Sequence, residues 1–372
     1  MLTIRCTKKL LDELKLKPYE NPEEKPFFSW HANLLTIYRR KAVLLINDKA
    51  RYPVLLFGLK APNFKQFDKI ITDAIEATFL AEGISPEIVD KYMKEAGQIS
   101  FARTSDRSLI SAMNQIAMLA GDCDPEELDM DNLIQTDFSL RMGDWLFKVD
   151  GDYKHPKEML LDAMTQFARG DAGVEVEQVV SIKAHQFLMA LDLENHKVWR
   201  RVIVPADITF MKFHNVIQDA FGWRNCHLYE FTILESENPV ARIVCDKEAM
   251  EYKDDTECPI EEDGKTKLTK YLPTYDQIGY VYDFGDDWVH YIELEKSIDD
   301  YDKNYPTCVD GEGNCPPEDV GGEGGYEAFL EAIGDPKNPE HEEMFEWAKM
   351  QYYRDFDIKR VNIDLKHSLR RR

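Results

Sequence analysis

The sequence predicts an α+β protein built from two α+β domains that are joined by an acidic connector. Short apolar runs typical of strands alternate with segments whose apolar residues recur every three or four positions, as in amphipathic helices. The 372 residues are enough for two to three domains of about 150 residues each. Hydrophobic residues make up 44% and aromatic residues 11% of the chain, which favours packed cores over disorder.

The first predicted domain covers residues 1–120. Thr7 can cap the first helix, Gly83 ends a long amphipathic helix, and Ser85-Pro86 begins another. The basic run Arg39-Arg40-Lys41 joins two strands. The expected elements are a strand at 2–6, a helix to about 15, strands at 27–38, 42–46 and 52–59, helices at 64–79 and from 85, a strand at 98–103 and a helix at 108–119.

Residues 121–178 form the predicted connector. Six acidic residues lie between positions 122 and 131, and glycine and aspartate recur further along. Such a change of composition typically marks a domain boundary. We expect a solvated segment with one helix near 156–168.

The second predicted domain covers residues 179–372. Its helix at 210–221 ends at Gly222, a favourable C-cap, and a second helix is expected at 326–333. Strands are expected at 182–193, 198–204, 228–234, 240–245, 280–284 and 289–294. Residues 297–346 hold 15 acidic residues and two lysines, whereas the last 26 residues hold eight basic residues and three acidic ones.

Three motifs of this domain, in order, resemble the plasmid pRiA4b ORF-3-like family. They are GWRNCHLYEF at 222–231, YDFGDDWVH at 282–290 and CPPEDVGGEGGY at 315–326, with WRR at 199–201 and His214 upstream. Some members of that family are labelled as passengers of insertion elements with a resolvase-type name, so the resemblance implies an association with mobile elements. It implies no activity, and neither recombinase constellation (an activated serine, or an Arg-His-Arg-Tyr set) can be placed in this sequence.

The first 120 residues resemble a separate small bacterial domain family of unknown function. The matching segments are CTKKL at 6–10, WHANLL at 30–35, RRK at 39–41, RS at 107–108 and SAMN at 111–114. This resemblance also implies no activity.

The motifs of the second domain suggest a divalent-metal site, for example for zinc or manganese. Histidine nitrogens and carboxylate oxygens are the ligands such ions take, and Glu318 or Asp319 could act as the general base. The candidate ligands are His214, His227, Asp283, Asp286 and His290. The competing interpretation is structural, because an aspartate in a tight turn caps its own backbone and a histidine beside tryptophan often belongs to the core.

Three further patterns suggest other ligands. The glycines at 321–325 precede a helix and could cradle a phosphate, although Glu318, Asp319 and Glu323 would repel an anion. Asp310, Glu312 and Asn314 alternate as calcium ligands do, without the full EF-hand pattern. Cys308 and Cys315 could be soft ligands or inert thiols.

Charge limits the partners. The net charge of −23 opposes contact with nucleic acid, which would depend on Arg39, Arg40 and Lys41 or on Arg370, Arg371 and Arg372. The acidic surface at 297–346 is the expected face for a protein partner. No run of about 18 apolar residues and no signal peptide is found, and the seven cysteines include no C-x-x-C pair, so we expect a cytoplasmic protein without a membrane span.

Two functions remain open from the sequence. The first is a non-catalytic interaction or regulatory protein, because no complete catalytic constellation is present. The second is a metal-dependent hydrolase, with phosphodiesters as the suggested substrate class. The position of the candidate ligands distinguishes the two functions: convergence on one site favours the hydrolase, and dispersal favours the interaction protein.

Overall fold

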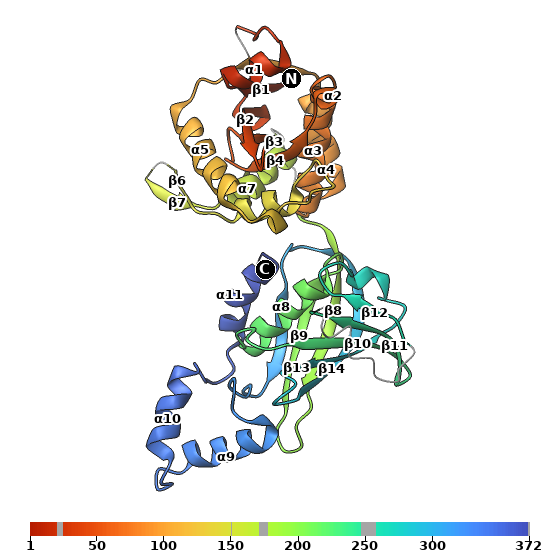
Figure 1. Ribbon diagram of the computed structural model, residues 1–372, viewed down its shortest axis with the longest axis vertical. Coiled ribbons are helices and arrows are strands. Elements are labelled where there is room, and N and C mark those ends of the chain that lie inside the picture. Colours follow the sequence, from red (N-terminus) through yellow and green to blue (C-terminus); the bar gives the residue numbers. More distant parts are fainter. Residues whose placement is uncertain (21–24, 150, 171–177, 247–257, 371–372) are drawn as a thin grey trace. The chain divides into compact units, whose positions relative to one another are not determined.

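The computed structural model divides the chain into two compact units, Met1–Ser181 and Ile182–Arg372 (Figure 1). It describes residues 1–20, 25–149, 151–170, 178–246 and 258–370. Each unit combines a main sheet with several helices, which confirms the α+β class.

The first unit is a three-layer arrangement around a five-stranded sheet with the order β4-β3-β2-β1-β5. Strand β1 runs parallel to both of its neighbours, and the other pairs are antiparallel. Its helices and strands are β1 (Leu2–Cys6), α1 (Lys8–Leu14), β2 (Ser29–Ile37), β3 (Arg40–Asn47), β4 (Pro53–Leu59), α2 (Ala61–Phe64), α3 (Phe67–Ala81), α4 (Pro86–Ala96), β5 (Ile99–Arg103), α5 (Arg107–Asp122), α6 (Thr136–Gly143), β6 (Phe147–Val149), β7 (Asp152–Lys154) and α7 (Pro156–Arg169).

Both faces of this sheet are buried because β3 is apolar at consecutive positions. Val43 and Leu45 face the core that α3, α4 and α7 complete, whereas Leu44 and Ile46 face the core that α5 and α6 complete. Successive strand residues point to opposite faces, so a continuous apolar run requires cover on both sides.

The structure differs from the expectation of a solvated connector at 121–178. Phe138, Met142 and Phe147 are buried in one core of the first unit, and Leu160 and Met164 of α7 are buried in the other. Acidic residues dominate the composition of this segment, which suggested a solvated connector. Its few apolar side chains nevertheless determine where the segment packs.

The second unit contains an eight-stranded sheet with the order β12-β11-β10-β13-β14-β8-β9-β15, antiparallel except for β11 and β12. Its helices and strands are β8 (Ile182–Leu191), β9 (Val198–Pro205), α8 (Phe210–Phe221), β10 (Tyr229–Glu235), β11 (Asn238–Val244), β12 (Ile260–Glu262), β13 (Gln277–Tyr282), β14 (Trp288–Tyr301), β15 (Thr307–Glu312), α9 (Gly322–Gly334), α10 (His341–Met350) and α11 (Ile358–Ser368).

Helix α8 packs on this sheet and ends beside the candidate site. The Thr209 hydroxyl accepts the Lys212 N–H at its start, and Gly222, at φ 87°, ends it in the left-handed region. Phe213 lies between Phe187 and Phe231 in the core. The loop that follows Gly222 leads into β10 and carries His227.

The acidic region 297–346 is structured along most of its length. Strand β14 continues to Tyr301, beyond the expected end at 294, because it pairs with β8 as far as Ile182. The glycines that were expected to form a loop at 322–325 belong to the first turn of α9.

Candidate metal centre

The register of the second sheet brings the three motifs to one end of the sheet. Tyr229, which begins β10, lies opposite Tyr282, which ends β13, and Tyr282 lies opposite Trp288 at the start of β14. His227 therefore precedes one strand, and Asp283 follows its neighbour, at the same edge. The third motif joins them from the segment between β15 and α9.

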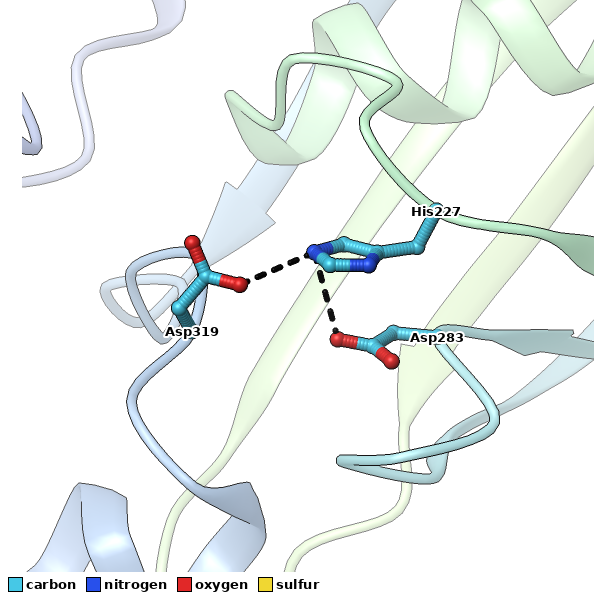
Figure 2. Close-up of side chains that lie close together, drawn as sticks. All are labelled: His227, Asp283 and Asp319. Atoms are coloured by element: carbon cyan, nitrogen blue, oxygen red, sulfur yellow. Dashed lines mark hydrogen bonds and ion pairs between the residues drawn. The ribbon is translucent and has the colours of Figure 1, made fainter.

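His227, Asp283 and Asp319 meet there (Figure 2). The His227 Nε2 atom lies 3.0 Å from Asp319 Oδ1 and 3.4 Å from Asp283 Oδ2. One ligand atom from each of the three residues lies within 4.8 Å of the others. The side chain of His227 is 28% exposed and that of Asp319 is 61% exposed, so the cluster is open to solvent on one side.

Backbone contacts fix the loop that carries His227. The Asn225 N–H donates to Gln218 Oε1 at 2.8 Å, and the Cys226 N–H donates to the Tyr282 hydroxyl at 2.9 Å. Asn225 has φ 55°, a conformation that asparagine adopts more readily than most residues. These two contacts fix the backbone that leads to His227.

Asp283 is held by an Asx turn. Its Oδ1 atom accepts the Gly285 N–H at 3.0 Å and the Asp286 N–H at 3.4 Å, while Oδ2 faces His227. The structural role that the sequence suggested for this aspartate is therefore present. It uses one carboxylate oxygen and leaves the other directed at the cluster.

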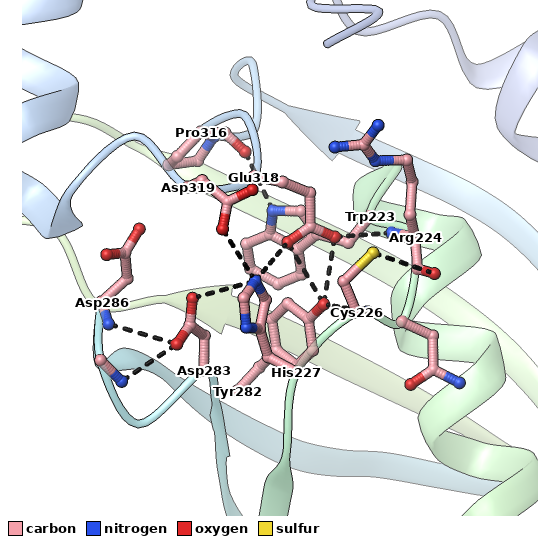
Figure 3. A network of polar contacts seen from close by, with 12 residues as sticks. Trp223, Arg224, Cys226, His227, Tyr282, Asp283, Asp286, Pro316, Glu318 and Asp319 are labelled. Carbon is pink, nitrogen blue, oxygen red and sulfur yellow. Dashed lines mark hydrogen bonds and ion pairs between the residues drawn. The ribbon is translucent and has the colours of Figure 1, made fainter.

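Glu318 lies behind the cluster and is buried (Figure 3). Its Oε1 atom accepts the Arg224 N–H at 2.7 Å and the Tyr282 hydroxyl at 3.0 Å, and its Oε2 atom lies 3.8 Å from His227 Nε2. Burial, followed by the charge of Glu318, raises the pKa of Tyr282, so this hydroxyl stays a donor. Glu318 thus faces the imidazole as a fixed, hydrogen-bonded carboxylate.

Asp286 is not part of the cluster. Its Oδ2 atom accepts the Gly321 N–H at 3.0 Å, which joins the turn after β13 to the start of α9. This carboxylate occupies the position that the phosphate-cradle hypothesis would give to an anion.

His214 and His290 lie in the core, away from these carboxylates. His214 Nδ1 lies 2.8 Å from the Tyr280 hydroxyl, its Nε2 lies 2.9 Å from Asn225 Oδ1, and its ring stacks on Tyr229. His290 Nδ1 lies 3.1 Å from the Trp288 carbonyl oxygen. Burial lowers the pKa of His214 to about 4 and that of His290 to about 3, so both are neutral at physiological pH.

Tyr282 and Gln218, which position the loops, were not predicted from the sequence. Tyr282 directly precedes Asp283 in the second motif, and Gln218 follows His214 by one helical turn. Helical spacing was the one signal that could have indicated Gln218, because positions four apart share a face of α8.

The other candidate ligand sets do not assemble among the described residues. Asp310 pairs with Arg201, the Glu312 carboxylate accepts the indole N–H of Trp199, and Asn314 bonds to the segment before α11. Cys308 is buried, and burial raises the pKa of its thiol to about 11. Of the basic tail, Arg371 and Arg372 lie outside the described residues.

The donor set suits a divalent cation. Ligand atoms about 2 Å from a zinc ion stand about 3.4 Å apart in a tetrahedral site, close to the spacing of His227 Nε2 and the two carboxylate oxygens. Imidazole suits zinc, and carboxylates suit manganese. The fold and this cluster together define an α+β protein with an open histidine–carboxylate site.

Comparison with known proteins identifies both parts of the chain. It belongs to the plasmid pRiA4b ORF-3-like protein family, whose model matches residues 183–365. Domain of unknown function (DUF6933) matches residues 3–159, which includes most of the segment expected to be a connector. Both resemblances drawn from the sequence are thereby confirmed.

Two known proteins are each similar to about half of the chain. The uncharacterized protein y4hQ of Sinorhizobium fredii is 36% identical over 179 residues, which cover 48% of this chain and 84% of the relative. The crystal structure of the protein of unknown function MM3350 from Methanosarcina mazei Go1 is 28% identical, with a TM-score of 0.41, over 48% of this chain and 96% of that one.

Within the described residues, no helix has both the length and the apolar character needed to cross a membrane.

Proposed function

We propose that this protein is a metal-dependent hydrolase whose second unit binds one divalent cation through His227, Asp283 and Asp319. The observation that carries the proposal is the meeting of these three side chains from separate motifs at one sheet edge. A set of three protein ligands that is open to solvent is the pattern of catalytic rather than structural metal sites.

The nearby groups have distinct roles in this proposal. A bound cation would lower the pKa of a coordinated water and so supply the nucleophile. Glu318 would accept the proton of that water, because its Oε2 atom faces His227 and its position is fixed by Tyr282 and Arg224. A phosphodiester is the first substrate class to assay, following the mobile-element association that the sequence resemblance implies.

A non-catalytic interaction protein is the second candidate, and a surface observation favours it. Helices α9 and α10 carry six acidic residues against one lysine, and Phe345 and Met350 of α10 are exposed beside them. Exposed apolar side chains within a charged surface are typical of docking sites. Both candidates fit a cytoplasmic protein, since all seven cysteines are free thiols.

Metal content tests the proposal. Untagged protein, loaded with zinc or manganese and then dialysed, should retain about one equivalent of metal by elemental analysis. His227→Ala should lose it, because the substitution removes the nitrogen ligand. Asp283→Asn should lose most of it while keeping the amide oxygen that accepts the Gly285 N–H.

His196→Ala is the matched control. His196 lies in the same unit, is 32% exposed and pairs with Glu327 at 3.0 Å, so its loss should leave the metal content unchanged. Hydrolysis of bis-p-nitrophenyl phosphate should follow the metal content across these variants. If the wild-type protein holds no metal, or if all variants hold it equally, the interaction protein is the better account.

A further inference from the structure

A second polar site lies in the first unit, far along the chain from the metal cluster. A hollow of about 730 Å³ is bordered by the turn between β2 and β3, by the end of β4 with the start of α2, and by residues 130–133. Its size falls within the range of small-ligand sites, roughly 300–1,000 Å³.

The hollow concentrates positive charge in a strongly negative protein. Four cationic side chains line it against one carboxylate, that of Asp131, although the whole chain carries a net charge of −23. The four are Arg39, Arg40, Lys41 and Lys60. A local excess of this kind attracts an anion in spite of the overall charge.

Most of these cations are not neutralised by the protein. Arg40 is held over the Phe57 ring at 5.8 Å, with its Nη1 3.7 Å from the Met130 sulfur, and has no carboxylate partner among the described residues. Arg39 and Lys60 also form no ion pair with any described side chain. Lys41 is the exception, because it pairs with Glu13 at 2.7 Å.

The wall of the hollow combines apolar and polar groups. Phe57, Leu59 and Met130 supply apolar surface. Asn63 and Asn132 use their side-chain oxygens to accept the N–H groups of Lys60 and Ile134, which leaves the amide NH₂ as the group each can offer an anion. A ligand with an apolar or aromatic part and a phosphate matches this lining.

We propose that this hollow binds a small phosphate ester, such as a nucleoside monophosphate, through Arg39, Arg40 and Lys60. Arginine and lysine form strong charge-assisted hydrogen bonds with phosphate oxygens. A long nucleic acid is disfavoured because it would extend beyond these few cations onto a protein of net charge −23. The proposal is independent of the metal centre and of its hydrolytic role.

Calorimetric titration of the full chain at low salt tests this site, with adenosine 5′-monophosphate and inorganic pyrophosphate as probes. Both should bind with a stoichiometry near one. The double variant Arg39→Gln, Lys60→Gln should bind at least about tenfold more weakly, because it loses two charge-assisted contacts. Both side chains are exposed, so the variant should keep the thermal transition of the wild type.

The matched control is Lys8→Gln, Lys9→Gln, which removes two exposed lysines of α1 and changes the net charge equally. Its affinity for both probes should stay within about twofold of the wild type, since these lysines do not line the hollow. Equal loss of probe affinity in both double variants would show that net charge alone determines binding, and it would overturn the proposal. Failure of both probes to bind would also overturn it, as would affinity for thymidine oligonucleotides that rises with length.

Discussion

His214 and His290 differ from His227 in burial, and burial determines what each imidazole can do. The two core histidines are almost inaccessible and hydrogen-bond to neutral groups, whereas His227 faces carboxylates at the surface. Transfer into a core disfavours the charged form of histidine. The same residue type therefore stabilises the core in two places and can offer a metal ligand in the third.

The two core histidines predict a pH dependence of stability. Their pKa values in the folded protein are about 4 for His214 and about 3 for His290, below the ordinary value of about 6.5. At a pH between the folded and the unfolded pKa of a histidine, the unfolded chain binds more protons than the folded protein. The free energy of unfolding therefore falls as pH drops below about 6.5. Each histidine should contribute a loss of roughly 2 kcal/mol between about pH 7.5 and about pH 5.

Urea unfolding of the wild type and of His290→Phe across this range measures the effect. The aromatic replacement suits a ring that packs edge-on against Phe221 and Trp223, and it removes one titrating group. The variant should therefore lose less stability than the wild type over the same pH interval, whatever its absolute stability. Identical pH slopes would show that His290 does not titrate as its burial indicates.

At the scale of elements, the turn into α9 positions Glu318 and Asp319. The Gly321 N–H is bound by Asp286, and Gly325 lies so close to the preceding turn that an added Cβ would stand 1.9 Å from the Val320 carbonyl oxygen. Gly324, one residue earlier in the helix, has no neighbouring atom within 4 Å of such a Cβ. Two adjacent glycines in one helix thus have opposite steric constraints.

Gly325→Ala should destabilise the second unit by about 1–3 kcal/mol, because the backbone must move to avoid the clash. That movement should displace Asp319 and weaken metal binding. The measurements are thermal unfolding and metal titration of the variant.

Gly324→Ala serves as the control for this substitution. It should be neutral or stabilising by up to about 1 kcal/mol, since alanine favours the helix more than glycine does. Metal affinity should be unchanged. Equal effects of the two substitutions would mean that contact with Val320 does not determine the start of α9.

At the scale of the whole molecule, the two units have separate cores. The buried residues of the second unit's core lie between Phe187 and Leu365. Those of the first unit's two cores, one on each face of its sheet, lie between Leu2 and Met164. Each unit has its own main sheet, and among the described residues no strand pairing crosses the division at Ser181. Units of this kind are expected to fold independently.

A fragment of residues 182–372 should therefore fold alone and bind metal with the affinity of the full chain. Circular dichroism and metal titration of the fragment check this expectation, and a His227→Ala fragment controls for non-specific binding. A fragment that is unfolded, or that is folded but does not bind metal retained by the full chain, would contradict it.

Much of the fold follows from local pattern. The strand expected at 2–6 and the helix expected at 210–221 coincide with β1 and α8, because apolar spacing and the Gly222 cap are local signals. The continuation of β14 to Tyr301 was missed, since its polar outer half is held by pairing with β8. Long-range pairing leaves little trace in the residues of one strand.

The sequence by itself determined the α+β class, the family and a short set of candidate residues, in which His227 and Asp283 were ligands and Asp319 was a general base. Only the tertiary structure decided which of these side chains share a site. It separated His214 and His290 from the carboxylates by burying them, and it placed the described residues of 121–170 in the first unit. The physical reason is that a residue's chemistry is local, whereas its distances and its exposure to water depend on segments far away in the chain.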